Sequence, residues 1–307
     1  MTRLSKFRAC PLCEAICGLE LQYEAGNLTA IRGDEADPFS RGHICPKGNA
    51  ILDLENDPDR LRRPMRRIGD DWQEIGWDEA FTLVGERLAA IQAEHGPDSV
   101  AAYLGNPNVH HFGHIAYLPF LLKLVRSRNV FSASSVDQWP HQLVNAQMYG
   151  HQFLLPVPDI DNTDYFLMLG ANPIASNGSL MTVPDVRERI KALTARGKLT
   201  VIDPRRTETA LLASAHHFIK PAGDVYFLIA FMQVLMQAGE ARIEAYAGKL
   251  NGFAEALSAI SAFRIENLQA LTGIAPETIT ALAGDFYRAD KAVAYGRMGV
   301  SVQSHGT

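Results

Sequence analysis

All four cysteines of this 307-residue chain lie within its first 45 positions, and this confinement limits what the N-terminal part can form. They are Cys10, Cys13, Cys17 and Cys45, with the spacing C-x2-C-x3-C-x27-C. Three thiolates on one short loop, joined by a fourth that returns from a distance, can each bind one iron of a cubane cluster. The spacing therefore predicts a 4Fe-4S cluster held by these four side chains.

Two other uses of the cysteines remain open. Structural zinc sites more often use two separated C-x2-C pairs, each of which supplies two corners of a tetrahedron. Disulfides, or cysteines packed without a ligand, are the other alternative, but disulfides are rare in a large cytosolic chain. No apolar leader precedes Cys10, so we expect a cytoplasmic location.

The stretch between Cys17 and Cys45 explains how the fourth cysteine can return to the first three. Residues 18–24 and 28–32 both alternate apolar and polar side chains, and residues 25–27 between them form a typical turn sequence. A β-hairpin uses up chain length and reverses its direction. The pattern therefore predicts a small β-hairpin domain around the cysteine site.

Beyond residue 76 the pattern changes to short apolar strands that alternate with helices. A helix is expected to begin at Asp78 and to end near Gly96. Such alternation is typical of parallel sheets with crossover helices, so the predicted fold class is α/β, with parallel-sheet α/β domains after the hairpin domain. Strands are expected at 99–104, 165–169, 199–202, 217–219 and 292–295, and helices at 115–125, 185–195, 225–236 and 276–287.

Composition excludes several classes of function. The net charge is −5, so no overall basic field is present to attract nucleic acid. No run of 18 apolar residues occurs, and no membrane span is expected. Five arginines between residues 60 and 67 are either a solvated linker or a seat for an anionic cofactor or a neighbouring domain.

The order of motifs along the chain resembles the molybdopterin oxidoreductase family, which includes formate dehydrogenases and nitrate reductases. The resemblance rests on the cysteine set closing with Cys45-Pro-Lys-Gly48, on residues 170–173 (Gly-Ala-Asn-Pro) and on residues 203–209 (Asp-Pro-Arg-Arg-Thr-Glu-Thr). It implies a 4Fe-4S cluster and bis-molybdopterin guanine dinucleotide with Mo or W. It also implies two-electron redox chemistry on a small molecule, with electrons leaving to a redox partner protein or electron-transfer subunit.

The resemblance also implies how the domains are arranged. We expect a 4Fe-4S domain at 1–64, a first pterin-binding α/β domain at 65–130 to which 291–307 return, and a second, dinucleotide-binding domain at 131–290. Family members carry a further C-terminal domain, so we expect the chain to be an N-terminal fragment. The alternative functions are a truncated electron-transfer or cofactor-binding module without its own catalysis, and a zinc-stabilised α/β scaffold.

Individual roles follow from the resemblance. Lys47 matches the lysine that lies between cluster and pterin in relatives. Asp137 stands where relatives place the protein ligand to Mo or W, and a carboxylate suits such a metal, although the residue could instead cap a helix. His141, four residues on, is a candidate for proton transfer or for packing. The dinucleotide-binding positions are Lys47, Asn108, Gly170, Ala171, Asn172, Ser176, Asp203, Arg205, Thr207, Ala222, Gly223 and Asp224.

Overall fold

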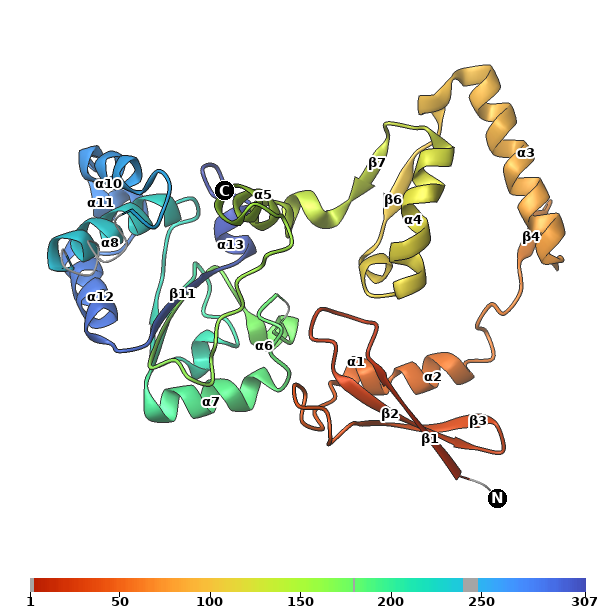
Figure 1. Ribbon diagram of the computed structural model, residues 1–307, viewed down its shortest axis with the longest axis horizontal. Helices are drawn as coiled ribbons and strands as arrows, with labels where there is room; N and C mark the ends of the chain where they lie inside the picture. Colours follow the sequence, from red (N-terminus) through yellow and green to blue (C-terminus); the bar gives the residue numbers. More distant parts are fainter. Residues whose placement is uncertain (1–2, 179, 240–247) are drawn as a thin grey trace. The chain divides into compact units, whose positions relative to one another are not determined.

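The computed structural model describes residues 3–178, 180–239 and 248–307, and the chain divides into two units, Met1–Ala133 and Ser134–Thr307 (Figure 1). Each unit has sheets of its own. Antiparallel strands occupy the beginning of the chain, and parallel strands with crossover helices follow. The predicted α/β fold class is therefore confirmed. Within the described ranges, no helix combines the length and the apolar character needed to cross a bilayer.

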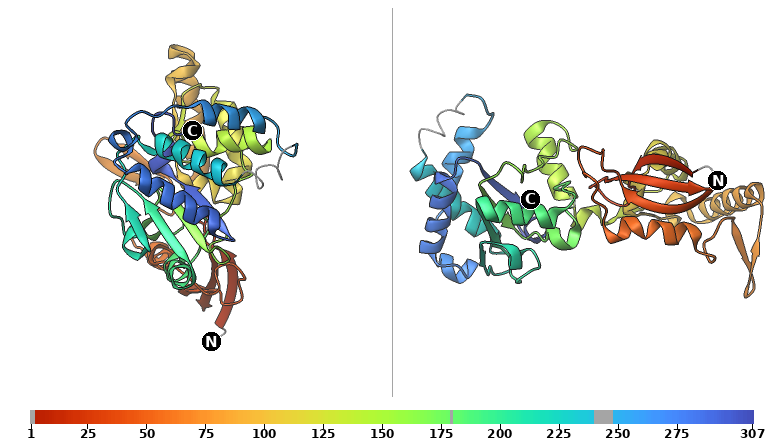
Figure 2. Two further views of the ribbon diagram at one scale, coloured as in Figure 1. Left: turned by 90° about the vertical axis from the view of Figure 1, so that its left-hand side faces the viewer. Right: turned by 90° about the horizontal axis from the view of Figure 1, so that it is seen from below.

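The first unit begins with a three-stranded antiparallel sheet of order β1-β2-β3. Strands β2 and β3 form the predicted hairpin, whereas β1 is an additional strand that the sequence analysis does not predict. Alternation along β2 buries Leu19 and Leu21 on one face of the sheet. Helices α1 and α2 contact β3 (Figure 2). The elements are β1 (Arg3–Ala9), β2 (Gly18–Glu24), β3 (Asn27–Gly33), α1 (Pro46–Asn49) and α2 (Ile51–Asn56).

The rest of the first unit contains a hairpin and a two-stranded parallel sheet, β6-β7, joined by a crossover through α4. Large apolar side chains stay exposed on α4, including Phe112 (87%), Tyr117 (74%) and Leu124 (75%). This part of the chain therefore presents an apolar surface. The elements are β4 (Met65–Ile68), β5 (Asp71–Glu74), α3 (Trp77–His95), η1 (Pro97–Ser99), β6 (Ala102–Leu104), η2 (Asn106–Val109), α4 (Phe112–Val125) and β7 (Val130–Ser132).

The second unit is built on a four-stranded parallel sheet with the order β10-β9-β8-β11. All five residues of β8 are buried, which agrees with its unbroken apolar sequence and its place inside the sheet. The strand expected at 217–219 lies slightly earlier, at β10. The strands are β8 (Tyr165–Leu169), β9 (Lys198–Ile202), β10 (Ala215–His217) and β11 (Ala292–Gly296).

Helices cover both faces of this sheet (Figure 1). Because side chains alternate along β8, Phe166 and Met168 belong to one buried cluster with α7, whereas Leu167 and Leu169 belong to another with α8 and α12. The helices are η3 (Ala133–Val136), α5 (Trp139–Tyr149), α6 (Pro173–Ser176), α7 (Val186–Arg196), η4 (Ala210–Leu212), α8 (Asp224–Ala238), α10 (Phe253–Ala262), α11 (Leu268–Thr272), α12 (Pro276–Arg288) and α13 (Met298–Ser301).

Strand β11 corrects the expected domain arrangement. The sequence analysis assigns residues 291–307 to the region of residues 65–130, but β11 pairs with β8 along its whole length. Tyr295 packs in the same buried cluster as Phe166, with 6.3 Å between ring centroids. The reason is physical: one edge of β8 would otherwise lack a hydrogen-bonding neighbour, and the apolar side chains of β11 complete the core around it.

The strand order creates a switch point beside β8, since β9 and β10 follow on one side and β11 returns on the other. Ligands of open α/β sheets bind beyond the carboxyl ends of the strands at such a point. Here the loops after β8 and β11 touch: Gly299 N donates to Gly170 O at 3.0 Å. A Cβ on Gly170 would lie 2.6 Å from Gly299 Cα, so the contact requires glycine there.

Candidate functional site

The four cysteines lie close together in the first unit. Cys10 N donates to Cys17 O at 2.8 Å, and Ile16 N donates to Cys13 O at 3.1 Å, which closes the loop that carries three of them. Cys45 directly precedes α1. Burial, and after it the charges of the neighbouring cysteines, raise the pKa of the Cys17 thiol to about 11. Burial likewise raises the pKa of Cys10, so these two thiols ionise reluctantly unless a metal compensates their charge.

A buried glycine lies beside the cysteines. Gly48 is buried, and a Cβ there would lie 2.9 Å from Ile44 Cγ1 and 3.9 Å from Cys10 Sγ, so glycine allows the chain after Cys45 to pass close to the cysteine loop. Across the described residues, no group of three or more His, Cys, Asp or Glu side chains converges as the ligands of one ion would.

Lys47 lies in α1, two residues after Cys45, and its side chain is exposed. The helix begins at Pro46, whose fixed φ suits a first helical position. The short helix therefore ties the position of Lys47 to that of the cysteine before it.

Asp137 lies just before α5 and forms an ion pair with Arg297, which directly follows β11. Arg297 Nη2 is 3.0 Å from Asp137 Oδ1, and the side chains are 12% and 36% exposed. The pair thus joins the beginning of α5 to the carboxyl end of a sheet strand. The alternative role of Asp137 as a helix cap is not observed, because the N-cap residue is Gln138 and no side-chain cap hydrogen bond is formed.

His141 and Asn145 are four residues apart and share one face of α5, and Asp137 lies two residues before that helix begins. His141 Nε2 lies 3.1 Å from Gly296 O. A carbonyl oxygen only accepts, so Nε2 donates and Nδ1 is left as an acceptor in the neutral ring. Burial, aided by the charge of Arg297, lowers the pKa of His141 and favours that neutral form.

Asp137 Oδ1 is buried and has no partner beyond its ion pair with Arg297, and three further side-chain atoms of this group are buried without a hydrogen-bond partner: His141 Nδ1, Asn145 Nδ2 and Arg297 Nη1. The last three residues line a cavity of about 210 Å³ between α5 and the segment after β11. Leaving one buried polar atom unpaired costs about 1–3 kcal/mol, so native structures rarely gather several in one place. Their concentration marks this cavity as a candidate binding site.

The sequence analysis predicts Asp137 and His141 but misses Asn145 and Arg297. The sequence signal for Asn145 is its spacing of eight residues from Asp137, close to two helical turns, which is not distinctive by itself. Arg297 follows a predicted strand, and such positions at the carboxyl end of a parallel sheet are where ligands bind. Its proximity to Asp137 depends on the strand order, which no local pattern reveals.

The predicted dinucleotide-binding loops after β8 and β9 are tied together. Asn172 Oδ1 accepts from Thr209 Oγ1 at 2.7 Å, and Asn172 Nδ2 donates to Glu208 Oε2 at 2.7 Å. Arg205 Nη2 is 3.2 Å from Glu208 Oε2, and hydrogen bonds to its own backbone, to Asn172 and to Arg205 lower the pKa of Glu208 to about 2. The structure thus places Gly170, Ala171, Asn172 and Ser176 on the loop and short helix after β8, and Asp203, Arg205 and Thr207 after β9.

Asp203 and Asp224 are two buried acidic residues at this end of the sheet. Asp224 begins α8 after Ala222, which has φ +65°, and Gly223. Burial, with a smaller contribution from the charge of Asp203, raises the pKa of Asp224 to about 6. Gln303 Nε2 donates to Asp224 Oδ2 at 3.3 Å. Two carboxyl groups held this way can accept hydrogen bonds from a sugar or a base.

Replacing Asp224 with asparagine is expected to stabilise the chain near neutral pH. The native state holds the Asp224 proton more tightly than the unfolded state, because the pKa rises from 3.8 to about 6. The free energy of unfolding of the wild type should therefore fall as pH rises from 4 to 6, by about 2–3 kcal/mol, whereas Asp224→Asn should lack this fall. Urea unfolding at pH 4.5 and 7.5 measures it. Equal pH dependence in both proteins would contradict the expectation.

Two remaining features lie apart from these groups. Asn108 belongs to the first unit, where its Nδ2 donates to Gly105 O at 3.0 Å.

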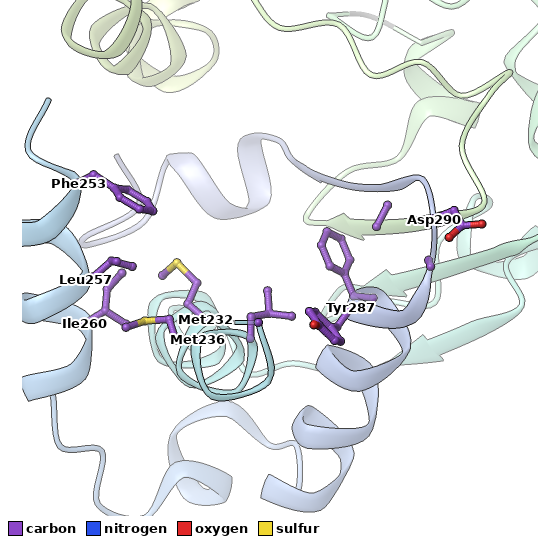
Figure 3. A pocket seen from close by; sticks show the side chains of 12 residues that line it. Met232, Met236, Phe253, Leu257, Ile260, Tyr287 and Asp290 are labelled. Carbon is purple, nitrogen blue, oxygen red and sulfur yellow. The ribbon is translucent and has the colours of Figure 1, made fainter. Parts of the chain in front are cut away.

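A larger cavity of about 380 Å³ lies among α8, α10 and α12, lined mainly by apolar side chains such as Met232, Leu257 and Phe286 (Figure 3). None of the predicted site residues lines that cavity.

Comparison with known families and proteins agrees with this geometry. Residues 60–283 match the model of the family described as molybdopterin oxidoreductase, and residues 8–57 match the molybdopterin oxidoreductase Fe4S4 domain. The four cysteines therefore lie within the matched Fe4S4 domain. Asp137, His141 and Asn145 lie within the matched molybdopterin oxidoreductase region, and Arg297 follows it.

Individual relatives cover nearly the whole chain. It is 24% identical over 298 residues to the F420-dependent formate dehydrogenase 2 subunit alpha of Methanococcus maripaludis, covering 97% of this chain and 43% of that protein. It is 27% identical over 301 residues to formate dehydrogenase H of Escherichia coli strain K12, covering 95% and 41%. The chain thus spans about two fifths of the length of these relatives. Its fold matches acetylene hydratase from Pelobacter acetylenicus with a TM-score of 0.76 at 20% identity, over 96% of this chain and 40% of that one.

Proposed function

Because this chain belongs to the molybdopterin oxidoreductase family and carries its Fe4S4 domain, we propose that it performs a two-electron redox reaction on a small molecule, with electrons leaving through a 4Fe-4S cluster. The cofactors of the family are molybdopterin with Mo or W and the cluster. The observation that carries the proposal is the group of Asp137, His141, Asn145 and Arg297 at the end of the sheet, in which His141, Asn145 and Arg297 each have a buried polar atom without a hydrogen-bond partner.

Within this proposal, Asp137 is the protein ligand to the metal. The bound metal centre supplies a change of two in oxidation state and an exchangeable position for substrate. A carboxylate is a hard oxygen donor suited to such a metal, and Asp137 Oδ1 has no partner beyond its ion pair with Arg297. Arg297 keeps the carboxylate oriented through their ion pair. His141 offers Nδ1 as a proton acceptor, since Nε2 is engaged with Gly296.

The proposed electron route leads through the first unit. Cys10, Cys13, Cys17 and Cys45 hold the cluster, and Lys47 lies on the path between it and the pterin. An external redox protein or electron-transfer subunit receives the electrons. We propose residues 1–64 as the cluster domain, 65–130 as the first pterin-binding domain and 131–290, extended by β11, as the second.

Cofactor contacts in the second domain come from the loops after β8 and β9 and from the beginning of α8. Asp203 and Asp224 accept hydrogen bonds from guanine or ribose, and Arg205 binds phosphate. The cofactor then has the form of a bis-molybdopterin guanine dinucleotide. The cytoplasmic location expected from the sequence stays a prediction.

Anaerobic purification, an absorption spectrum, and assays of iron, acid-labile sulfide, zinc and molybdenum or tungsten test the proposed function. Iron and sulfide together with molybdenum or tungsten support the oxidoreductase. Iron and sulfide alone, in protein produced by cells that make the pterin cofactor, favour the electron-transfer module instead. Stoichiometric zinc without sulfide favours the scaffold and overturns the proposal.

Lys47→Ala is expected to leave the cluster assembled while slowing its reduction by substrate by about 10-fold or more, since an ammonium group beside the electron path offsets cluster and pyrophosphate charge. Stopped-flow measurement of cluster bleaching in the full-length enzyme tests this. Lys47→Arg, which keeps the charge, serves as the control and should retain most of the rate. A reduction rate unchanged in Lys47→Ala would remove this residue from the route.

A further inference from the structure

We infer that Arg8, on strand β1, raises the reduction potential of the 4Fe-4S cluster through its positive charge. The inference rests on the proposed function for the cluster and its four cysteines, and it adds a residue that sets how readily the cluster accepts an electron. Its basis is the register of β1 with β2, which places Arg8 on the same face of the sheet as Cys10 and Cys17.

The register of β1 fixes the side of the sheet on which Arg8 lies. Arg8 is paired with Leu19 on the neighbouring strand β2 (Figure 1). Cys10 N donates to Cys17 O at 2.8 Å, so the pairing continues past the end of β1. Residues two apart along a strand share a face, and their Cα atoms lie about 7 Å apart. Arg8 and Cys10 therefore project from one face, together with Leu19 and Cys17 opposite them.

This face of the sheet bears the apolar core around the cysteines. Leu19 packs in that core with Cys10 and Cys17. A cavity of about 500 Å³ adjoins the core, and its walls include Arg8, Leu19 and Pro11, the residue after Cys10. Arg8 thus lies beside the chain that forms the cysteine loop, although it is exposed to solvent.

The charge of Arg8 is left without an acidic partner. No carboxylate pairs with Arg8 in the part of the chain that the structure describes. Glu55 is the only acidic residue among the described residues that line the cavity, and it pairs with Arg60 and Arg62 instead. Burial raises the pKa of Cys10, and the charge of Arg8 opposes that rise. The guanidinium charge therefore acts at the cysteine loop.

A positive charge in this place favours the reduced cluster. Reduction adds one negative charge to the cluster and its thiolates, so a nearby cation stabilises the reduced state more than the oxidised state. Net charge is one of the properties by which a protein sets the potential of such a cluster. Removing the charge of Arg8 should therefore lower the potential. Because Arg8 is exposed, salt should screen part of this effect.

Redox titration of the anaerobically purified full-length enzyme, followed by the electron paramagnetic resonance signal of the reduced cluster, tests the inference. We expect Arg8→Gln to lower the ratio of reduced to oxidised cluster at a fixed potential by about three- to tenfold, which corresponds to about 30–60 mV for a one-electron couple. The shift should become smaller as the ionic strength is raised from about 0.05 M to about 1 M.

Arg32→Gln is the matched control, because it removes the same charge from the same sheet. Arg32 is also exposed, and its pairing with Glu20 on β2 places it on the face opposite to that of Leu19 and Arg8. Its replacement should change the ratio by less than about twofold. Arg8→Lys keeps the charge and should stay close to the wild type, whereas Arg8→Glu reverses it and should about double the shift.

Iron and acid-labile sulfide assays show whether each variant holds its cluster. A potential that is equal in Arg8→Gln and wild type, or an equal shift in Arg32→Gln, would overturn the inference while leaving the proposed function in place. Loss of the cluster from both Arg8→Gln and Arg8→Lys would also overturn it, since the role of Arg8 would then be structural. A wild type that holds zinc without sulfide would overturn the proposed function and the inference with it.

Discussion

Replacing Cys45 with serine is expected to reduce the iron and acid-labile sulfide of the anaerobically purified protein from about four each per chain to less than about a tenth of that. Cys10, Cys13 and Cys17 share one loop, whereas Cys45 arrives only after the β2–β3 hairpin and closes the site. Without it, one iron loses its thiolate, and the buried thiols left behind resist ionisation. Iron and sulfide assays with the absorption spectrum measure the loss.

Lys47→Ala is the control for this experiment, since it alters the same short helix without removing a thiol. It should retain the full iron and sulfide content. Full cluster content in Cys45→Ser, or stoichiometric zinc without sulfide in the wild type, would show that the cysteines do not bind a cluster in the predicted way.

Asp137→Ala is expected to remove an oxygen ligand from the molybdenum or tungsten and to lower turnover of the full-length enzyme by more than about 100-fold. Changes to residues that only orient a metal ligand already cost about 10–100-fold, so loss of a ligand should cost more. X-ray absorption at the metal edge measures the coordination shell directly. Asp137→Cys should keep the metal bound and replace that oxygen with sulfur.

Asp161→Ala provides a matched control for Asp137. Asp161 is 37% exposed and pairs with Arg189, much as Asp137 is 36% exposed and pairs with Arg297. Loss of an ion pair of this kind on α7 should leave the metal shell unchanged. A shell that stays the same in Asp137→Ala, with activity retained, would rule out this residue as the ligand.

Local sequence patterns predict the cysteine site and most of the second sheet well. A shared cysteine site can be predicted because three of the cysteines lie within eight positions. Strand β8 can be predicted because it is an unbroken apolar run between a turn and a glycine. Both signals lie within a few residues of chain. Strand β1 is missed because most of its side chains are exposed and polar, so it lacks a buried face that would mark it.

The partners of Asp137 are harder to predict from sequence. Arg297 lies 160 positions away along the chain and reaches Asp137 because β11 pairs with β8, which the sequence analysis assigns differently. Strand order depends on which edge of β8 still lacks a neighbouring strand, and that is a property of the assembled sheet. Asn145 is missed for another reason: a single amide on a helix has no distinctive pattern until the groups opposite it are known.

The contact between Gly170 and Gly299 has a consequence for how sequences of this fold can change. A side chain on either glycine would collide with the backbone of the other segment. In most packed pairs, a larger residue on one side is accommodated by a smaller one on the other. Here no smaller residue exists, so neither position can compensate for the other. Natural variation among close relatives should therefore leave both glycines in place, even where the surrounding loops differ in length and composition.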